Sequence, residues 1–227
     1  MGLSNRSGLE SALGELFSAE KKARDLADEM ASGPPELVLA VLTEAVERAR
    51  KLPDDEERVA RLSSVAKILG SLGGPAAVDA LIDILGSEEH EARHAAGVVI
   101  EDMAFERFKE VALGVERALA KLPPDHMALS ELPYILIEIP EPGVLKLVHR
   151  FLEHANEEVA AAAIEACVEL GDPSSVPKLA KLERDTRLVE LDEGDEPDRN
   201  SDASVTIGEL AKEARLLLQS LEPEDRA

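Results

Sequence analysis

Aromatic residues and cysteine are scarce in this sequence. The 227 residues include no tryptophan, one tyrosine and four phenylalanines, so aromatic side chains make up 2% of the chain. Because aromatic residues favour strands whereas the abundant Ala, Leu, Glu and Arg favour helices, the composition predicts an all-α fold with no convincing strand. The single cysteine, Cys167, excludes an intrachain disulfide and a cysteine-based zinc site. Its setting, IEACVEL, predicts a small core residue.

Basic residues and long apolar runs are also in short supply. Lys and Arg number 25 against 47 Asp and Glu, which gives a formal net charge of -22. Since nucleic-acid binding depends on Lys and Arg at the phosphates, this balance argues against a nucleic-acid partner and favours a protein with a basic surface. No apolar run approaches the ~18 residues of a membrane span, and no signal-peptide layout opens the chain. We therefore expect a cytoplasmic protein with no membrane partner.

Helical periodicity runs through most of the sequence. Apolar residues recur three and four positions apart, as in Leu9, Leu13, Leu16 and Phe17. Six breakers divide the chain into about eleven helices of roughly 12 to 20 residues. These breakers are SGPP, LPDD, LGGP, LPPD, IPEP and LGDP. The segment YILIEI, 134–139, has the composition of a strand, but the repeat described next places a helix there.

An internal repeat organises these helices. The tripeptides GGP at 73–75, PEP at 140–142 and GDP at 171–173 each follow an apolar helix end and precede Val-x-x-Leu. Their first residues are 67 and 31 positions apart, which corresponds to two periods and one period of about 33 residues. The missing corner falls near residue 106, in MAFERFKEV, which lacks Gly and Pro. We therefore expect a degenerate junction there.

The segment EEVAAAAIEACVELGDPSSVPKLAKL, 157–182, resembles the HEAT repeat, specifically the short bacterial kind related to phycobilin lyase repeats. The resemblance implies a right-handed α-α superhelix, in which first helices line the convex side and second helices line the concave side. We expect one HEAT-like solenoid domain over 1–227 with about five helix pairs and an N-terminal helix. The pairs are placed at 35–71, 75–103, 105–138, 141–170 and 174–220. The expected segments are an N-terminal capping helix at 8–31, repeats at 35–182, an acidic loop insertion at 183–204 and a C-terminal helix at 205–222.

One motif carries possible metal chemistry. HEARHAAG, 90–97, matches the HExxH pattern in which two histidines of a helix bind zinc and the glutamate, here Glu91, acts as general base. The match even extends to the following glycine. However, Ile100 stands where the longer version of the motif has its third histidine.

The repeat register indicates that the two histidines of this motif are exposed surface residues rather than metal ligands. When Ala96 is aligned with Ala163, the apolar residues of both helices fall on one packing face. His90 and His94 then lie on the polar stripe. We therefore expect no metal, no cofactor and no catalytic residue, with a metal-dependent hydrolase at His90, Glu91 and His94 as an alternative.

Charge is distributed unevenly between the two helices of each pair. The predicted first helices contain equal numbers of acids and bases, whereas the second helices contain about three acids for every base. Carboxylates in a first turn are explained by capping and by the helix dipole, but those late in a helix are disfavoured by the dipole. These late positions predict a carboxylate strip on the concave face. The candidate partner-binding residues are Glu91, Asp102, Glu158, Glu165 and Glu169.

The sequence therefore predicts a non-catalytic scaffold or adaptor that binds a partner protein through an acidic concave face. An alternative is an immunity or inhibitor protein whose carboxylates mimic nucleic acid and neutralise a basic toxin or nuclease. Two enzyme alternatives are the metal-dependent hydrolase and a lyase similar to the phycobilin enzymes, for which the resemblance supplies only the fold.

Overall fold

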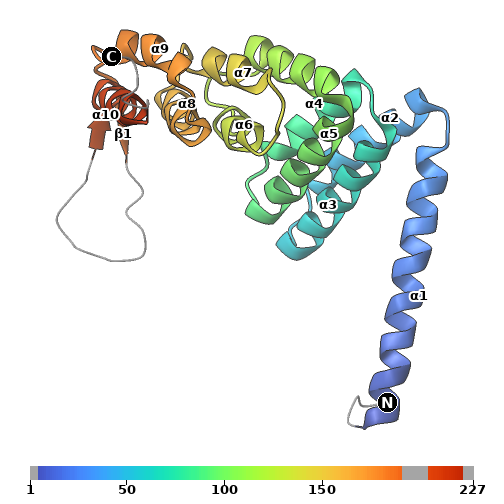
Figure 1. Cartoon of the computed structure of the whole chain (residues 1–227). Coiled ribbons are helices and arrows are strands. Elements are labelled where there is room, and N and C mark those ends of the chain that lie inside the picture. Colours follow the sequence, from blue (N-terminus) through green and yellow to red (C-terminus); the bar gives the residue numbers. More distant parts are fainter. Residues whose placement is uncertain (1–4, 191–203, 222–227) are drawn as a thin grey trace.

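The computed structural model describes residues 5–190 and 204–221, which form ten α-helices, one 3-10 turn and a pair of short strands. Helices stack side by side in two layers, and one long helix projects from the end of the stack (Figure 1). The first five helices are α1 (Arg6–Ala31), α2 (Pro35–Ala49), α3 (Asp55–Leu72), α4 (Pro75–Leu85) and α5 (His90–Lys121). The other five are α6 (Ala128–Ile137), α7 (Val144–Phe151), α8 (Glu157–Leu170), α9 (Val176–Leu182) and α10 (Ile207–Ser220).

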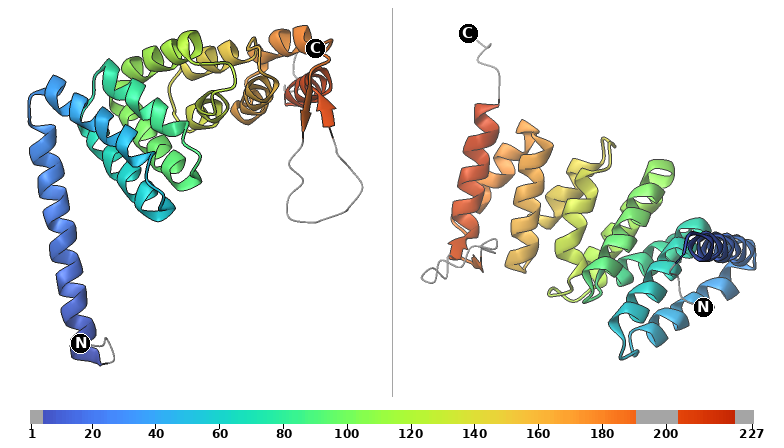
Figure 2. Two further views of the ribbon diagram at one scale, coloured as in Figure 1. Left: turned by 180° about the vertical axis from the view of Figure 1, so that it is seen from behind. Right: turned by 90° about the horizontal axis from the view of Figure 1, so that it is seen from below.

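The two layers correspond to the first and second helices of the predicted pairs. Helices α2, α4, α7 and α9 and the later part of α5 form one layer, while α3, the early part of α5, α6, α8 and α10 form the other. Seen from the side of the second helices, this second layer lies as a row across the view (Figure 2). The predicted all-α, right-handed solenoid of helix pairs is confirmed.

A continuous apolar core runs between the layers from α2 to α10. Helix α4 packs on α5, α6 packs on α8, and α8 packs on α10, so each pair covers the apolar stripe of its neighbour. The largest fully buried side chains include Leu42, Leu62, Leu81, Ile100, Leu132 and Phe151.

None of the described helices combines the length and the apolarity needed to cross a membrane.

Glycine forms the sharpest corner of the stack, between α3 and α4. Gly73 and Gly74 have φ values of 67° and 87°, a region that side-chain-bearing residues rarely adopt, and Pro75 then begins α4. A Cβ atom on Gly73 would lie 1.7 Å from Nη1 of Arg107. The predicted GGP corner is therefore confirmed, and its first glycine is required for two separate reasons.

The degenerate junction predicted near residue 106 is a kink. The element α5, His90–Lys121, consists of two helical segments that meet at Arg107, which has the non-helical angles φ -139° and ψ 44°. The Nη2 atom of Arg107 donates a hydrogen bond of 2.8 Å to the carbonyl oxygen of Gly70, which ties the kink to the preceding pair. The two segments of α5 therefore supply the second helix of one pair and the first helix of the next.

Arginine side chains fasten the turn within successive pairs. Arg58 and Arg93 each lie four residues after the N-cap of their helix. Arg58 donates from Nη1 to the carbonyl oxygen of Leu52. Arg93 donates from Nη1 to the carbonyl oxygens of Ser87 and Glu88, at 3.0 and 2.8 Å. These guanidinium groups satisfy carbonyl oxygens of the turn that joins the first helix to the second.

In α8 the same position is Ala160, which is buried. Arg187, just after α9, supplies the missing guanidinium from the next pair. Its Nη1 donates to the carbonyl oxygens of His154 and Ala155, at 2.8 and 2.7 Å. By the repeat alignment these are the same two carbonyl positions that Arg93 binds in its own turn.

Two short strands pair within and at the end of the segment predicted as an acidic insertion. Strand β1 (Leu188–Glu190) pairs in antiparallel fashion with β2 (Ser204–Thr206), with Leu188 opposite Thr206. The expectation of no strand is therefore wrong at these positions, because a three-residue pairing is too short to produce a recognisable period in the sequence. The acidic insertion predicted at 183–204 lies largely outside the described residues, which resume at 204.

The helix expected over 8–31 forms as α1, but it projects from the stack and is seen almost end-on when the second helices lie across the view (Figures 1 and 2). None of its residues is buried. It contacts α2 and α3. In this structure α1 therefore leaves the outer side of the first pair uncovered.

The surroundings of Gly73 and Gly171 predict that substitution by alanine costs more stability at Gly73 than at Gly171. Replacing Gly73 with Ala should lower the free energy of unfolding by about 2 to 4 kcal/mol, because it adds a collision with Arg107 to the strained φ. Gly171 has φ 63° with nothing within 4 Å of its added Cβ, so Gly171→Ala should cost only about 1 kcal/mol. Urea unfolding measures both values. Equal losses would mean that the guanidinium of Arg107 moves aside freely.

The contacts of the Arg187 guanidinium predict that two nearby arginine substitutions differ in their effect on stability. Arg187→Ala should lower the free energy of unfolding by about 1 to 3 kcal/mol, since it leaves two carbonyl groups without their donor and Asp185 without its ion-pair partner. Arg184→Ala, at an exposed position three residues earlier, is the matched control and should change stability by less than about 0.5 kcal/mol. Thermal and urea unfolding of the two variants distinguish them. Equal stabilities of the two variants would contradict the role of Arg187 in stabilising the turn.

Candidate functional site

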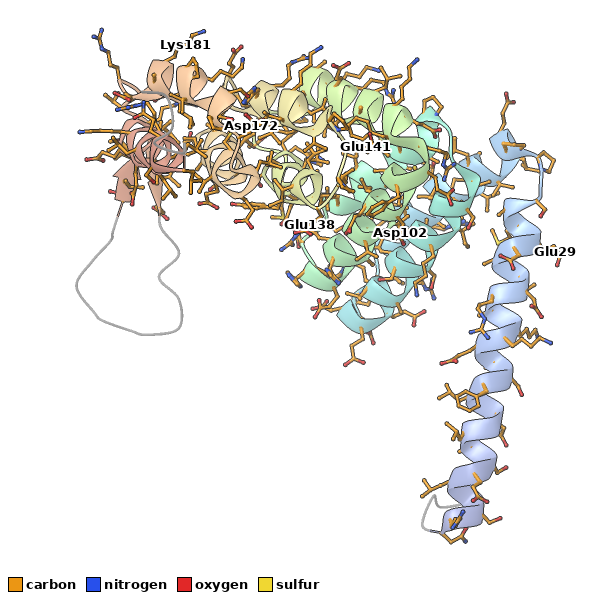
Figure 3. All side chains as sticks on the ribbon, viewed as in Figure 1. Glu29, Asp102, Glu138, Glu141, Asp172 and Lys181 are labelled. Atoms are coloured by element: carbon orange, nitrogen blue, oxygen red, sulfur yellow. The ribbon has the colours of Figure 1, made fainter. Side chains whose placement is uncertain are left out.

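All five predicted partner-binding carboxylates are exposed in the structure, on two helices of the second layer. Helix α5 carries Glu91 and Asp102, and α8 carries the other three. Helix α6 packs against both α5 and α8 and therefore lies between the two groups. Asp102 and Glu138, which follows α6, project from this layer (Figure 3). We refer to the exposed carboxylates of this region and Tyr134 as the acidic face, which comprises Glu91, Asp102, Tyr134, Glu138, Glu158, Glu165 and Glu169.

The carboxylates of the acidic face have no cationic partners in the part of the chain that the structure describes. None of the six forms an ion pair within the described residues. Helices α6 and α8 contain no Lys or Arg at all. Like charges gathered on one face repel one another, so a cationic surface placed against them would be attracted.

Some carboxylates of the first layer are neutralised by arginines of neighbouring pairs. Asp83 of α4 lies 3.0 Å from Arg50, which follows α2. Asp79 of α4 lies 2.7 Å from Arg117 in the later part of α5. The six carboxylates of the acidic face lack such an ion pair among the described residues.

The one arginine in the early part of α5 is already engaged. Arg93 is mostly buried and lies 2.9 Å from Glu131 of α6, in addition to its two carbonyl contacts. It therefore links α5 to α6 and neutralises Glu131. Its charge is not available to the exposed carboxylates around it.

Tyr134 is the aromatic residue of the acidic face. Its hydroxyl group donates a hydrogen bond of 2.6 Å to Oε2 of Glu165, which joins α6 to α8. Burial raises the pKa of Tyr134 above its usual range, and the hydrogen bond to the Glu165 carboxylate raises it further, so the phenol remains a protonated donor. The ring still exposes 43% of its surface. The sequence analysis missed this residue, although it is the only tyrosine in the chain and sits between two acidic helices.

A groove of about 240 Å³ runs between α5 and α6 beside Tyr134. Its floor includes the apolar residues Val98 and Ile135, and Gly97 keeps the helices close, because a Cβ atom there would lie 3.2 Å from Cδ1 of Ile135. The polar residues around it are His90, Arg93, His94, Glu101, Glu131, Tyr134 and Glu138. An apolar floor inside a carboxylate rim suits a side chain that has an aliphatic stem and a cationic end.

The two histidines of the HExxH motif lie on the rim of this groove. Both are exposed, and their rings are parallel within 2° with centroids 6.3 Å apart. Ile100, in place of a third histidine, is buried in the core. No group of three or more His, Cys, Asp or Glu residues that could hold a metal ion occurs among the residues that the structure describes. Within that part of the chain, His90 and His94 therefore have no third ligand.

A buried polar cluster joins Cys167 to a histidine that the sequence analysis had not connected with it. Nε2 of His149 lies 2.9 Å from Oγ of Ser175, and the Ser175 side chain also lowers the pKa of the Cys167 thiol, against the larger effect of burial. Burial raises the pKa of Cys167 to about 11 and lowers the pKa of His149. A protonated thiol that is fully buried is a poor nucleophile, so this cluster is a core feature.

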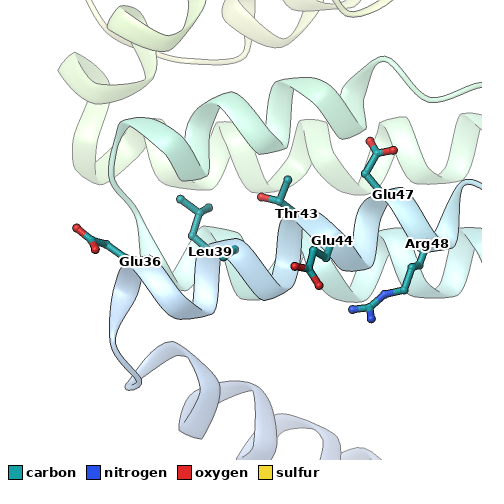
Figure 4. A pocket seen from close by; sticks show the side chains of 7 residues that line it. Glu36, Leu39, Thr43, Glu44, Glu47 and Arg48 are labelled. Atoms are coloured by element: carbon teal, nitrogen blue, oxygen red, sulfur yellow. The ribbon is translucent and has the colours of Figure 1, made fainter.

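A second, apolar groove lies at the free end of the solenoid, on α2 (Figure 4). It measures about 580 Å³ and is lined by Leu39, Ala40 and Thr43. Charged residues of α2, including Glu44 and Arg48, border it. This is the surface that α1 leaves uncovered.

Comparison with known proteins identifies one repeat directly. Residues 62–87, from within α3 to the turn after α4, match the family described as PBS lyase HEAT-like repeat. The matched residues differ from segment 157–182, whose sequence resembles the HEAT repeat. Two separate parts of the chain are therefore similar to this repeat family. A search of curated proteins finds no match.

Three solved structures show the level of structural likeness. An engineered protein is 20% identical, with 88% of this chain and 90% of that chain covered and a TM-score of 0.32. A designed armadillo repeat protein is 17% identical, with 95% of both chains covered and a TM-score of 0.33. Another, in complex with the peptide (KR)4, is 18% identical, with the same coverage and TM-score. Scores this low support no argument about a shared site.

The matched repeat lies inside a stack of helix pairs, and it includes the Gly-Gly-Pro corner at which α4 begins. The chain therefore contains a repeat similar to the PBS lyase HEAT-like family within an all-helical stack of helix pairs.

Proposed function

We propose that this protein is a non-catalytic scaffold that binds a partner protein with a basic surface through the acidic face. The HEAT-like repeat fold is typical of protein-binding scaffolds, because a row of parallel helices offers a long surface that the core does not need. The observation that carries the proposal is the set of exposed carboxylates on α5, α6 and α8 without ion-pair partners among the described residues.

Charge alone would give a fast but weak encounter, and the groove beside Tyr134 supplies a second element. Exposed aromatic residues anchor interfaces because they bury a large area with little loss of side-chain entropy. Here Tyr134 lines the groove together with Val98 and donates its hydrogen bond to the carboxylate of Glu165. A Lys or Arg side chain of the partner would lay its stem on Tyr134 and Val98 and direct its cation to the surrounding carboxylates.

An inhibitor of a basic toxin or nuclease would use the same acidic face, and the identity of the partner separates that role from an adaptor. Neither enzyme alternative gains support from the described residues. The hydrolase would need a third ligand beside His90 and His94, and the lyase interpretation rests on the fold alone.

Charge reversal tests the proposed surface. Asp102, Glu165 and Glu169 changed together to Lys should weaken binding of the partner, once it has been isolated with the wild-type protein, by roughly tenfold or more. The salt dependence of the affinity should also become shallower, since fewer opposite charges meet across the interface.

The control variant carries the same change in net charge away from the acidic face, with Asp28, Glu44 and Glu153 changed to Lys. It should keep most of the wild-type affinity. Calorimetric titration at two salt concentrations measures both variants, and circular dichroism establishes that each is folded. Unchanged binding by the first variant would place the partner on another surface.

The non-catalytic part of the proposal is tested by metal analysis. Protein purified without an affinity tag or chelator should contain well below one zinc ion per chain, because the described residues offer His90 and His94 no third ligand. Its melting temperature should not change on addition of a chelator. Stoichiometric zinc that disappears when both histidines are changed to Ala would instead support the hydrolase.

A further inference from the structure

Helix α1 exposes its apolar side chains to solvent along its length. Its 26 residues include none that are buried, and its large apolar side chains expose between 36% and 57% of their surface. Isolated helices gain little stability in water, and most helical stability in proteins comes from packing of an apolar face. A contiguous exposed apolar stripe of this kind marks an interaction site. The exposed residues are Leu9, Leu13, Leu16, Phe17, Leu26 and Met30.

Apolar residues of α1 follow the spacing typical of a two-stranded coiled-coil seam, with Leu13 and Phe17 lying beside it. Starting at Leu9, an apolar residue recurs at alternating intervals of three and four residues through the whole helix, with no polar interruption. Several of these positions are alanine, which allows two helices to approach closely. The seam consists of Leu9, Ala12, Leu16, Ala19, Ala23, Leu26 and Met30.

We propose that α1 pairs with α1 of a second copy of this chain, in an antiparallel coiled coil in which Leu16 of each copy faces Ala19 of the other. In this register Leu9 faces Leu26 and Ala12 faces Ala23. Leucine pairs therefore lie near both ends of the seam, with Met30 beyond them, and small residues lie opposite large or small ones between the leucine pairs.

The charges beside the seam select this arrangement. Glu15 and Lys22 occupy equivalent positions, one heptad apart, immediately before seam residues. In the proposed register Glu15 of each copy lies opposite Lys22 of the other, which gives two attractive pairs. An antiparallel shift by one heptad would instead place Lys22 opposite Lys22, and Glu15 opposite Glu29. A parallel pair would bring Glu15 beside Glu20, so both competing arrangements are repulsive.

The shape of the molecule leaves room for this dimer. Helix α1 extends about 39 Å at the usual rise per residue and stands clear of the helix layers (Figure 1). A twofold axis through the middle of α1 places the two solenoids at opposite ends of the coiled coil. The two acidic faces, which repel each other, are thereby kept apart.

The oligomeric state of the full chain is the first test. Sedimentation equilibrium of the wild-type protein at micromolar concentrations should give twice the mass of one chain. Leu16→Glu should give a monomer at the same concentrations, with the melting temperature of the solenoid unchanged. A wild-type monomer would overturn the proposal, and it would indicate that α1 covers the groove on α2 of its own chain.

Charge exchange tests the register itself. Glu15→Lys or Lys22→Glu alone should each raise the dissociation constant of the dimer roughly three- to tenfold, whereas the double variant should restore it, because the pairs are then re-formed with opposite signs. Lys21→Glu, on the outer side of α1, is the matched control and should have no effect. A dimer strengthened by Glu15→Lys would indicate the parallel arrangement, and single variants identical to wild type would exclude the proposed register.

Discussion

Each helix pair of this chain can bury its apolar stripe only against the pairs beside it, and the rest of the structure follows from this constraint. Side chains such as Leu62, Leu81 and Phe151 are fully buried because a neighbour covers them. The outer surface of the second layer makes no contribution to that core and is free to carry charge. The ends of the stack lack a neighbour, which is why apolar surface remains on α2 and α1.

The carboxylates of the two layers that have been described differ in their ion pairing. In the first layer, ion pairs such as Asp83 with Arg50 cross between neighbouring pairs and add to their cohesion. In the second layer, the carboxylates of α8 repel one another while the alanine-rich side beneath them packs tightly. Packing therefore holds a surface that electrostatics alone would disfavour, and binding of a cationic partner would relieve this repulsion.

Much of the fold could be predicted because its rules are local. The glycine of the GGP corner, the weak junction that became the kink at Arg107, and the common packing face of Ala96 and Ala163 all follow from periodicity and turn chemistry. The rest depends on contacts between distant residues. No pattern in the sequence shows that Arg187 serves a turn more than 30 positions earlier, or that Tyr134 reaches Glu165. Nor does the stripe of α1 reveal by itself what covers it.

The position of the only tyrosine has an optical consequence. With no tryptophan in the chain, nearly all of its near-ultraviolet absorption and emission arises from one phenol ring, and that ring lies on the acidic face. Its hydrogen bond to a carboxylate makes the excited state sensitive to whatever displaces or neutralises that carboxylate. The protein thus carries a native fluorophore at a single defined place on its surface, so occupancy of that place can be followed by light without any label.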